Sequence, residues 1–148
     1  MEKLRFAFAI CKNNLISEDT FGKAPKYHIY DYCFVQKQFF FFAEVSNPSI
    51  GKLTKGKKLN AIIGFFKQHS IDVLVAKTYE KLLNAENKFV IPILINTSTP
   101  QDACLVLKRH IKWLYDEKNL NKKEYMLFKI EKGIVKYKLE DNERYTVN

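Results

Sequence analysis

The chain has 148 residues, of which 47% are hydrophobic and 28% are charged, and its net charge is +9 at pH 7. This length suits one domain with its own core, and this composition excludes a disordered chain. No apolar stretch is long enough to span a bilayer, and three widely spaced cysteines exclude a disulfide framework. We therefore expect a cytoplasmic globular protein without a membrane partner. Its basic charge suits an anionic ligand or simply a solvated lysine surface.

The N-terminal half predicts three strands followed by a helix. Leu4 to Cys11 is a buried first strand, and a long polar loop separates it from strands at Tyr27 to Cys33 and Val35 to Val45. In the last of these, Phe39 to Phe42 are contiguous rather than alternating, so we expect both of its faces to be covered. The apolar stripe that follows predicts a helix from about Lys55.

The C-terminal half alternates strands and helices. The segment IDVLVA, residues 71–76, predicts a strand, and Thr78 is expected to cap a short helix through Leu83. FVIPILIN predicts the next strand, after a parallel crossover. Thr99, with Pro100 behind it, predicts the start of a helix through Tyr115. Alternating residues on both sides of Lys132-Gly133 predict a β-hairpin.

The loop GKLTKGKK, residues 51–58, has the glycine and lysine spacing of a phosphate-binding P-loop. That motif needs a Ser or Thr after its lysine to hold Mg²⁺, and Lys58 stands there instead. The sequence therefore argues against nucleotide hydrolysis. Lys55, Lys57 and Lys58 at a helix start still predict a non-catalytic anion site.

Residues for other chemistry are sparse. No nucleophile elbow and no paired-histidine zinc motif is present, so we expect a protein that is not an enzyme. Cys11 and His28 would approach each other if the first two strands pair antiparallel, and such soft ligands suit iron–sulfur or other transition-metal centres. The alternative is a buried cysteine and an unrelated strand histidine.

The string FGKAPKYHIYD, Phe21 to Asp31, carries a resemblance to a known family. Together with RFAFAI, Asn47-Pro48, the lysine and glycine loop and IDVLVA, it resembles the dinitrogenase iron-molybdenum cofactor biosynthesis family, the NifX-like small proteins. The resemblance implies an α/β, ribonuclease H-like three-layer fold with a mixed five-stranded sheet and helices on its faces. Residues 1–118 would form this domain. Residues 119–148 would form a C-terminal hairpin extension packed on the same domain or on a partner subunit.

The resemblance also implies a function and a site. The protein would be a non-enzymatic carrier of an iron–sulfur or iron-molybdenum cluster, or of another small anion if cluster binding has been lost. The binding face would combine the loop after the first strand, the loop before the first helix and the loop after IDVLVA. Its candidate ligand-binding residues are Thr20, Phe21, Gly22, Lys23, Lys55, Lys57, Lys58 and Lys77. Cys11 and His28 are the candidate metal ligands, and Thr20 stands where many family members have a histidine. The alternatives are a module that binds nucleic acid or a phosphate ligand through residues 51–58, and an interaction protein that forms a homo-oligomer.

Overall fold

The computed structural model describes residues 2–80, 90–120, 127–130, 134–137 and 144–146. These residues form one mixed seven-stranded sheet and a separate two-stranded sheet. In spatial order the main sheet contains β3 (Gln38–Ser46), β2 (Lys26–Cys33), β1 (Lys3–Ile10), β4 (Val73–Ala76), β6 (Ile91–Ile95), β7 (Leu127–Ile130) and β8 (Ile134–Tyr137). Strands β1, β4, β6 and β7 run parallel, whereas the pairs β1–β2, β2–β3 and β7–β8 are antiparallel.

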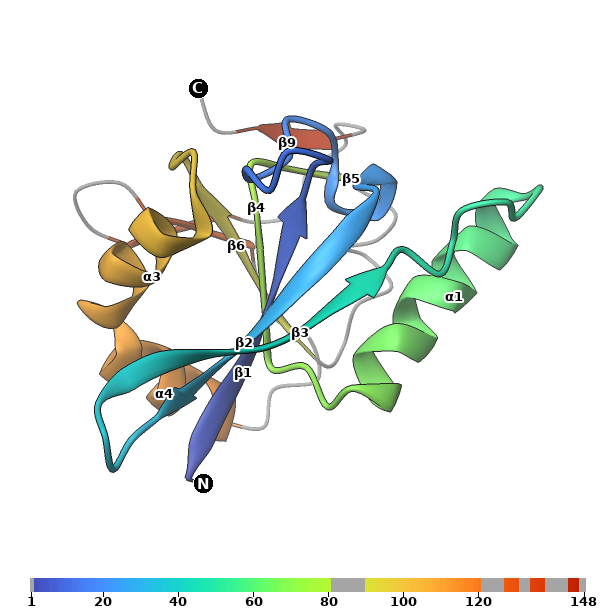
Figure 1. Cartoon of the computed structure of the whole chain (residues 1–148). Helices are drawn as coiled ribbons and strands as arrows, with labels where there is room; N and C mark the ends of the chain where they lie inside the picture. The colour runs from blue at the N-terminus through green and yellow to red at the C-terminus, as the bar shows by residue number, and fades with distance from the viewer. Residues whose placement is uncertain (1, 81–89, 121–126, 131–133, 138–143, 147–148) are drawn as a thin grey trace.

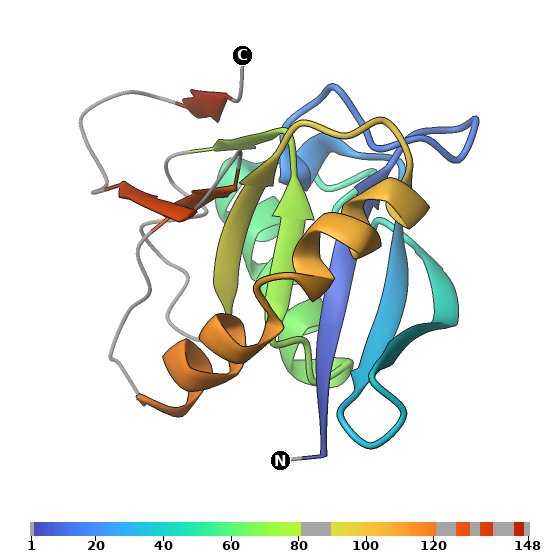
Figure 2. The same ribbon diagram turned by 90° about the vertical axis from the view of Figure 1, so that its left-hand side faces the viewer.

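Helices cover both faces of the main sheet. Helix α1 (Lys55–Gln68) lies on one face, and helices α3 (Pro100–Lys108) and α4 (Ile111–Asn119) lie on the other (Figures 1 and 2). All residues of β4 and β6 are buried, as expected for apolar strands covered on both sides. An α/β fold with a mixed sheet and helices on its faces is thus confirmed.

The sheet has seven strands rather than the predicted five because β7 pairs with β6 and β8 pairs with β7. The expected division between residues 118 and 119 falls inside α4, and β7 continues the same sheet. The predicted turn at Lys132-Gly133 lies outside the described residues. Within those residues no helix is long and apolar enough to cross a membrane.

Two predicted helix starts are confirmed by their capping bonds. The Oγ1 of Thr54 accepts a hydrogen bond from the backbone N–H of Lys57 at the start of α1, and Thr99 does the same for Asp102 at the start of α3. The prediction of one helix through Tyr115 is wrong. At Arg109 and His110 the backbone N–H groups bond three residues back, so α3 ends there and α4 begins separately.

The predicted helix from Thr78 begins with a strand instead. Residues Thr78–Glu80 form β5, which pairs antiparallel with β9 (Arg144–Thr146) in the two-stranded sheet. Thr78 therefore lies in a strand and does not cap a helix. Its partner strand is more than 60 residues away in the chain, so the local sequence around Thr78 could not predict this pairing. The remainder of the predicted helix, up to Leu83, lies outside the described residues.

Strand β3 contradicts the prediction that its phenylalanines are covered. It is an edge strand, and Phe40, Phe41 and Phe42 are 40%, 55% and 54% exposed. The ladder with β2 pairs Ile29 with Ala43 but Tyr30 with Phe41, which leaves Phe42 as the extra residue of a β-bulge. The contiguous aromatic run thus reflects a bulge and an open sheet edge rather than burial on both faces.

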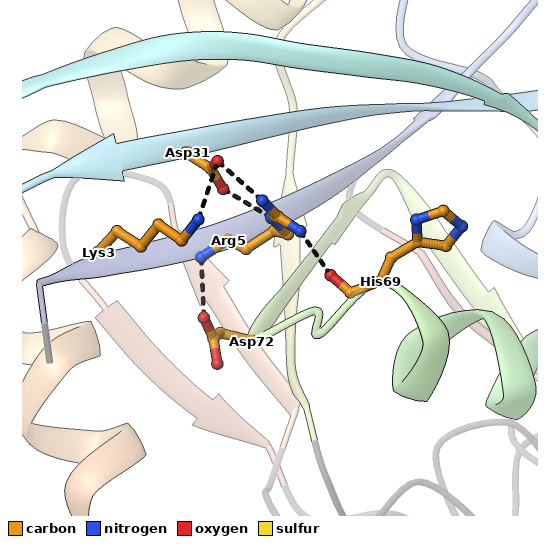
Figure 3. A network of polar contacts seen from close by, with 5 residues as sticks. All are labelled: Lys3, Arg5, Asp31, His69 and Asp72. Atoms are coloured by element: carbon orange, nitrogen blue, oxygen red, sulfur yellow. Dashed lines mark hydrogen bonds and ion pairs between the residues drawn. The ribbon is translucent and has the colours of Figure 1, made fainter.

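Arg5 joins β1 to four other segments near the end of the sheet where β1 begins (Figure 3). Its Nε and Nη2 donate to the two carboxylate oxygens of Asp31 in β2 at 2.8 and 3.0 Å, and its Nη1 donates to the carbonyl oxygen of His69 at 2.9 Å. Its guanidinium lies 4.1 Å from the ring centroid of Phe42. The backbone of Arg5 also exchanges two 2.8 Å hydrogen bonds with Asp72, one to its carboxylate and one from its N–H. The network is largely shielded from water.

Replacing Arg5 with methionine leaves the Asp31 carboxylate without its bidentate partner. Because both side chains are mostly buried, we expect Arg5→Met to lower the free energy of unfolding by about 3 kcal/mol in urea denaturation. Lys3→Met is the matched control, since Lys3 contacts the same carboxylate at 3.6 Å with a side chain that is 55% exposed. It should cost less than about 1 kcal/mol. Equal losses in the two variants would contradict the role assigned to Arg5.

Candidate functional site

The carboxyl ends of β1, β4 and β6 lie at one edge of the sheet, together with the loops that follow them (Figure 2). From β1 the chain proceeds to β2 on one side, and β4 later adds on the other side. The strand order therefore reverses between β1 and β4. In open α/β sheets, ligands bind at this kind of position, outside the carboxyl ends of the strands.

Lys77 directly follows β4 at this edge and is only 8% exposed. Its Nζ donates to the Oε1 of Glu18 at 2.6 Å, and Glu18 belongs to the loop after β1. The side chain of Glu18 is 85% exposed. A buried ammonium is therefore neutralised by a carboxylate whose side chain is itself largely solvated. An exposed partner of this kind holds its geometry only weakly.

Two buried hydroxyls lie in the loops of the same edge. Thr20, which is 2% exposed, and Thr97, which follows β6, each have a buried Oγ1 without a hydrogen-bond partner among the described residues. Buried hydroxyls are nearly always paired, and each orphan costs about 1–3 kcal/mol. These two oxygens are therefore notable as groups that a ligand would satisfy.

Thr20 is held beside the segment that contains Lys77. Glu18 bonds Lys77, the ring of Phe21 stacks on that of Tyr79 at 5.9 Å, and the backbone N–H of Gly22 donates to Glu80 at 3.1 Å. Residues 18–22 thus run alongside residues 77–80 with Thr20 between the contacts. On the other side of the loop, the N–H of Ile16 donates to the carbonyl of Ser98 at 2.9 Å, next to Thr97.

The FGKAP motif itself is structural. Phe21 is fully buried and stacks on Tyr27 with ring centroids 4.6 Å apart. The Tyr27 hydroxyl donates back to the carbonyl of Phe21 at 2.8 Å, and burial raises the pKa of that hydroxyl well above its usual value. The side chain of Phe21 therefore contributes to the core instead of lining a ligand surface.

Gly22 and Asn47 fasten two predicted binding loops together. The Nδ2 of Asn47 donates to the carbonyls of Gly22 and Ala24 at 2.8 and 2.7 Å, and the Ser49 hydroxyl donates to the Asn47 side chain at 2.7 Å. A Cβ on residue 22 would collide with the carboxylate of Glu80. A side chain at this position would therefore displace the end of the flexible Glu80 side chain, which also accepts a hydrogen bond from the Gly22 N–H.

Cys11 and His28 do not contact each other directly. The β1–β2 register pairs His28 with Phe8, three residues before Cys11. The Sγ of Cys11 donates to Asn13 at 2.6 Å, whereas the Nε2 of His28 lies 2.9 Å from the Oε1 of Glu44. Among the described residues no group of three or more His, Cys, Asp or Glu side chains is arranged to hold a metal ion. Cys11 does line an open depression of about 520 Å³ with Lys12, Asn13, Asp19 and Pro25.

The remaining candidate lysines are exposed. Lys23 ends the short helix η1 (Phe21–Lys23), and Lys55, Lys57 and Lys58 form the first turn of α1. This turn projects outward beyond η1 at the side of the molecule (Figure 1). The contacts therefore place residues 18–22, which include Thr20, alongside residues 77–80, which include Lys77, while Lys55, Lys57 and Lys58 lie on the outward projection (Figure 1).

Two site residues were missed by the sequence analysis. Glu18 is 59 positions from Lys77, so no local pattern connects them. Thr97 comes directly after the apolar segment FVIPILIN, and polar residues at the carboxyl end of a parallel strand are a recognisable signal.

Neither the protein-family models nor the curated proteins compared with this chain give a match.

Gly22→Ala should destabilise the protein because the new Cβ forces Glu80 away from the backbone N–H that it accepts from. We expect a loss of about 1 kcal/mol in urea denaturation, the net value of the displaced hydrogen bond. Gly64→Ala is the matched control. Gly64 lies in α1, and the position that a Cβ would take there meets no atom of the described residues within 4 Å, so this variant should gain about 0.5–1 kcal/mol. In a double-mutant cycle, Glu80→Ala should recover part of the Gly22→Ala loss, and strict additivity would contradict this account.

Proposed function

We propose that this protein binds a small anionic ligand, without catalysis, between the loops that follow β1, β4 and β6. The observation that carries the proposal is the buried Lys77 ammonium, held by an exposed carboxylate from a loop in which the Thr20 hydroxyl is buried without a partner among the described residues. A buried cation and a free hydroxyl are the donors that carboxylate and phosphate oxygens require. The location at the reversal of strand order supports the same conclusion.

The ligand would replace Glu18 on Lys77. A carboxylate or phosphate oxygen accepts the ammonium hydrogen bond at the same place as Glu18 Oε1, and the Glu18 side chain, already largely exposed, returns to water at little cost. The Thr20 hydroxyl then donates to a second ligand oxygen, with Thr97 as the third donor. Binding thus converts two unfavourable buried hydroxyls into charge-assisted hydrogen bonds.

The neighbouring polar groups support binding rather than catalysis. The hydroxyl of Ser17, 1% exposed in the same loop, accepts from the N–H of Asp19 at 3.1 Å. The only histidine of the β1–β2 ladder, His28, is engaged with Glu44. Cys104 lies on α3, where burial raises the pKa of its thiol to about 12, so it is not a thiolate near pH 7. None of these groups is prepared as an activated nucleophile.

A metal cluster is one form of this anionic ligand. The resemblance to the NifX-like family, and with it a ribonuclease H-like fold, remains a prediction that the order of the first elements supports: three strands, a helix and a strand. In the cluster version Cys11, partly exposed at the mouth of the same loop, would supply a thiolate. Iron and sulfide therefore belong beside phosphate among the probes.

Lys77→Met should weaken anion binding while keeping most of the length and bulk of the side chain. We expect inorganic phosphate to bind the unmodified protein and to bind Lys77→Met at least about tenfold more weakly in isothermal titration calorimetry, because a charge-assisted hydrogen bond is lost. Glu18→Gln should have the opposite effect and strengthen binding, since it removes the competing carboxylate. Lys112→Met, at an exposed position of α4, is the control and should bind like the unmodified protein.

Equal phosphate binding by the Lys77 and Lys112 variants would remove Lys77 from the site. The same titrations with succinate test a carboxylate ligand. Anaerobic incubation with iron and sulfide, followed by desalting and iron analysis, tests the cluster version. If phosphate, succinate and iron all fail to bind, the proposal is wrong.

Thr20→Val should separate the ligand role of the hydroxyl from a structural one. Because Thr20 Oγ1 is buried without a partner in the described part of the chain, valine should raise the free energy of unfolding of the ligand-free protein by about 1 kcal/mol. The same substitution should weaken phosphate binding severalfold. A structural threonine would instead give destabilisation with unchanged binding, which would contradict the proposal. Thr99→Val, at the N-cap of α3, is the contrasting control and should destabilise.

A further inference from the structure

The loop between β3 and α1 presents a firm projection from the body of the protein (Figure 1). Its base is fastened by Asn47 and Ser49, both buried, and the N–H of Asn47 donates to the carbonyl of Pro25 at 3.1 Å. Two turn bonds follow, from Ile50 to Asn47 and from Lys52 to Ser49. Gly51 has a φ of +86°, a left-handed conformation that favours glycine. The tip is therefore an ordered turn that the buried residues Asn47 and Ser49 anchor to the body of the protein.

This tip is both basic and apolar. Ile50 and Leu53 are 64% and 91% exposed, although side chains of their kind are usually buried. Exposed lysines flank them on the same loop and in the first turn of α1: Lys52, Lys55, Lys57 and Lys58. No acidic residue occurs between Glu44 and Asp72. We call residues 50–58 the basic loop.

We infer that the basic loop docks on the surface of an anionic membrane. The lysines would face the anionic head groups, and Ile50 and Leu53 would enter the boundary between head groups and acyl chains. Clustered lysines next to a membrane each contribute attraction to anionic lipids, and exposed aliphatic side chains add apolar burial. A surface contact of this kind needs no membrane-spanning helix.

The same features fit a nucleic acid less well. Lysines do neutralise phosphates, but single-stranded bases stack on aromatic rings, and the exposed apolar residues of the basic loop are aliphatic. An oligonucleotide would leave Leu53 in water. The membrane surface explains both the charge and the exposed aliphatic pair, and it does so independently of any ligand at Lys77.

Sedimentation with vesicles tests the inference. The protein should bind vesicles made of equal parts phosphatidylcholine and phosphatidylserine at low salt, and should not bind pure phosphatidylcholine. Each Lys→Gln change at Lys52 or Lys58 should weaken binding about fivefold. The double variant Ile50→Ser with Leu53→Ser should weaken it about tenfold. These positions are exposed, so the variants are expected to fold.

Matched controls lie elsewhere on the surface. Val35→Ser with Leu105→Ser removes two exposed aliphatic side chains, and Lys108→Gln and Lys112→Gln remove two exposed charges. None of these should change vesicle binding. In addition, a tryptophan introduced by Leu53→Trp should show a blue-shifted emission when anionic vesicles are added.

Three results would overturn the inference. The first is no binding to the anionic vesicles at low salt. The second is equal loss of binding in the loop variants and in their controls. The third is salt-dependent binding to a single-stranded oligonucleotide without binding to vesicles, which would assign the basic loop to nucleic acid. Phosphate binding at Lys77 is measured separately and does not depend on any of these outcomes.

Discussion

Arg5 is the residue on which the arrangement of the sheet most depends. Its side chain joins β2 through Asp31, β3 through the ring of Phe42, and the end of α1 through the carbonyl of His69. Its backbone joins the start of β4 through Asp72. The parallel register of β1 and β4 is thereby set at one end of the strands. At the other end, this register brings the loop after β1 beside Lys77.

Arg5 and Lys77, the largely buried cations at opposite ends of the strands, are neutralised in different ways. Around Arg5, the guanidinium donates two hydrogen bonds to the Asp31 carboxylate and one to a backbone carbonyl. This pairing suits a structural role. Around Lys77, a bond to an exposed glutamate neutralises the ammonium, and the Thr20 hydroxyl in the loop of that glutamate has no partner within the described ranges of the chain. The first arrangement stabilises the protein as it stands. The second leaves the Thr20 hydroxyl without an acceptor among the described residues, as the proposed anion site requires.

The sequence correctly predicted the strands and helix starts that depend on short-range patterns. The apolar runs of β1, β4 and β6, the apolar stripe of α1 and the capping residue Thr99 each act within a few residues, and all were recognised. The cap at Thr54 is equally local, but the sequence analysis did not name it. Predictions failed where distant segments decide the outcome. The bulge at Phe42 follows from pairing with β2, and the strand at Thr78 follows from pairing with residues near the C-terminus.

The candidate site shows the same division. Thr20 and Lys77 could be named from the sequence, because they lie in loops that a resemblance to a known family marks as a binding face. Their properties could not, because Glu18 reaches Lys77 from 59 positions away and the burial of the Thr20 hydroxyl is a property of the folded chain that no local pattern encodes. The FGKAP string was the most specific sequence signal, yet Phe21 and Gly22 within it serve packing and a close backbone approach.

The open edge of β3 has a consequence for biosynthesis. Strands β1, β2 and β3 precede α1, β4 and β6 in the chain, so this antiparallel meander emerges from the ribosome before the elements that cover its faces. Its last strand carries four successive phenylalanines and lies at the edge of the described sheet, features that promote pairing between chains. Until the covering helices and strands emerge, the aromatic edge of the meander is open to pairing with other chains, and chaperone binding would protect it at that stage.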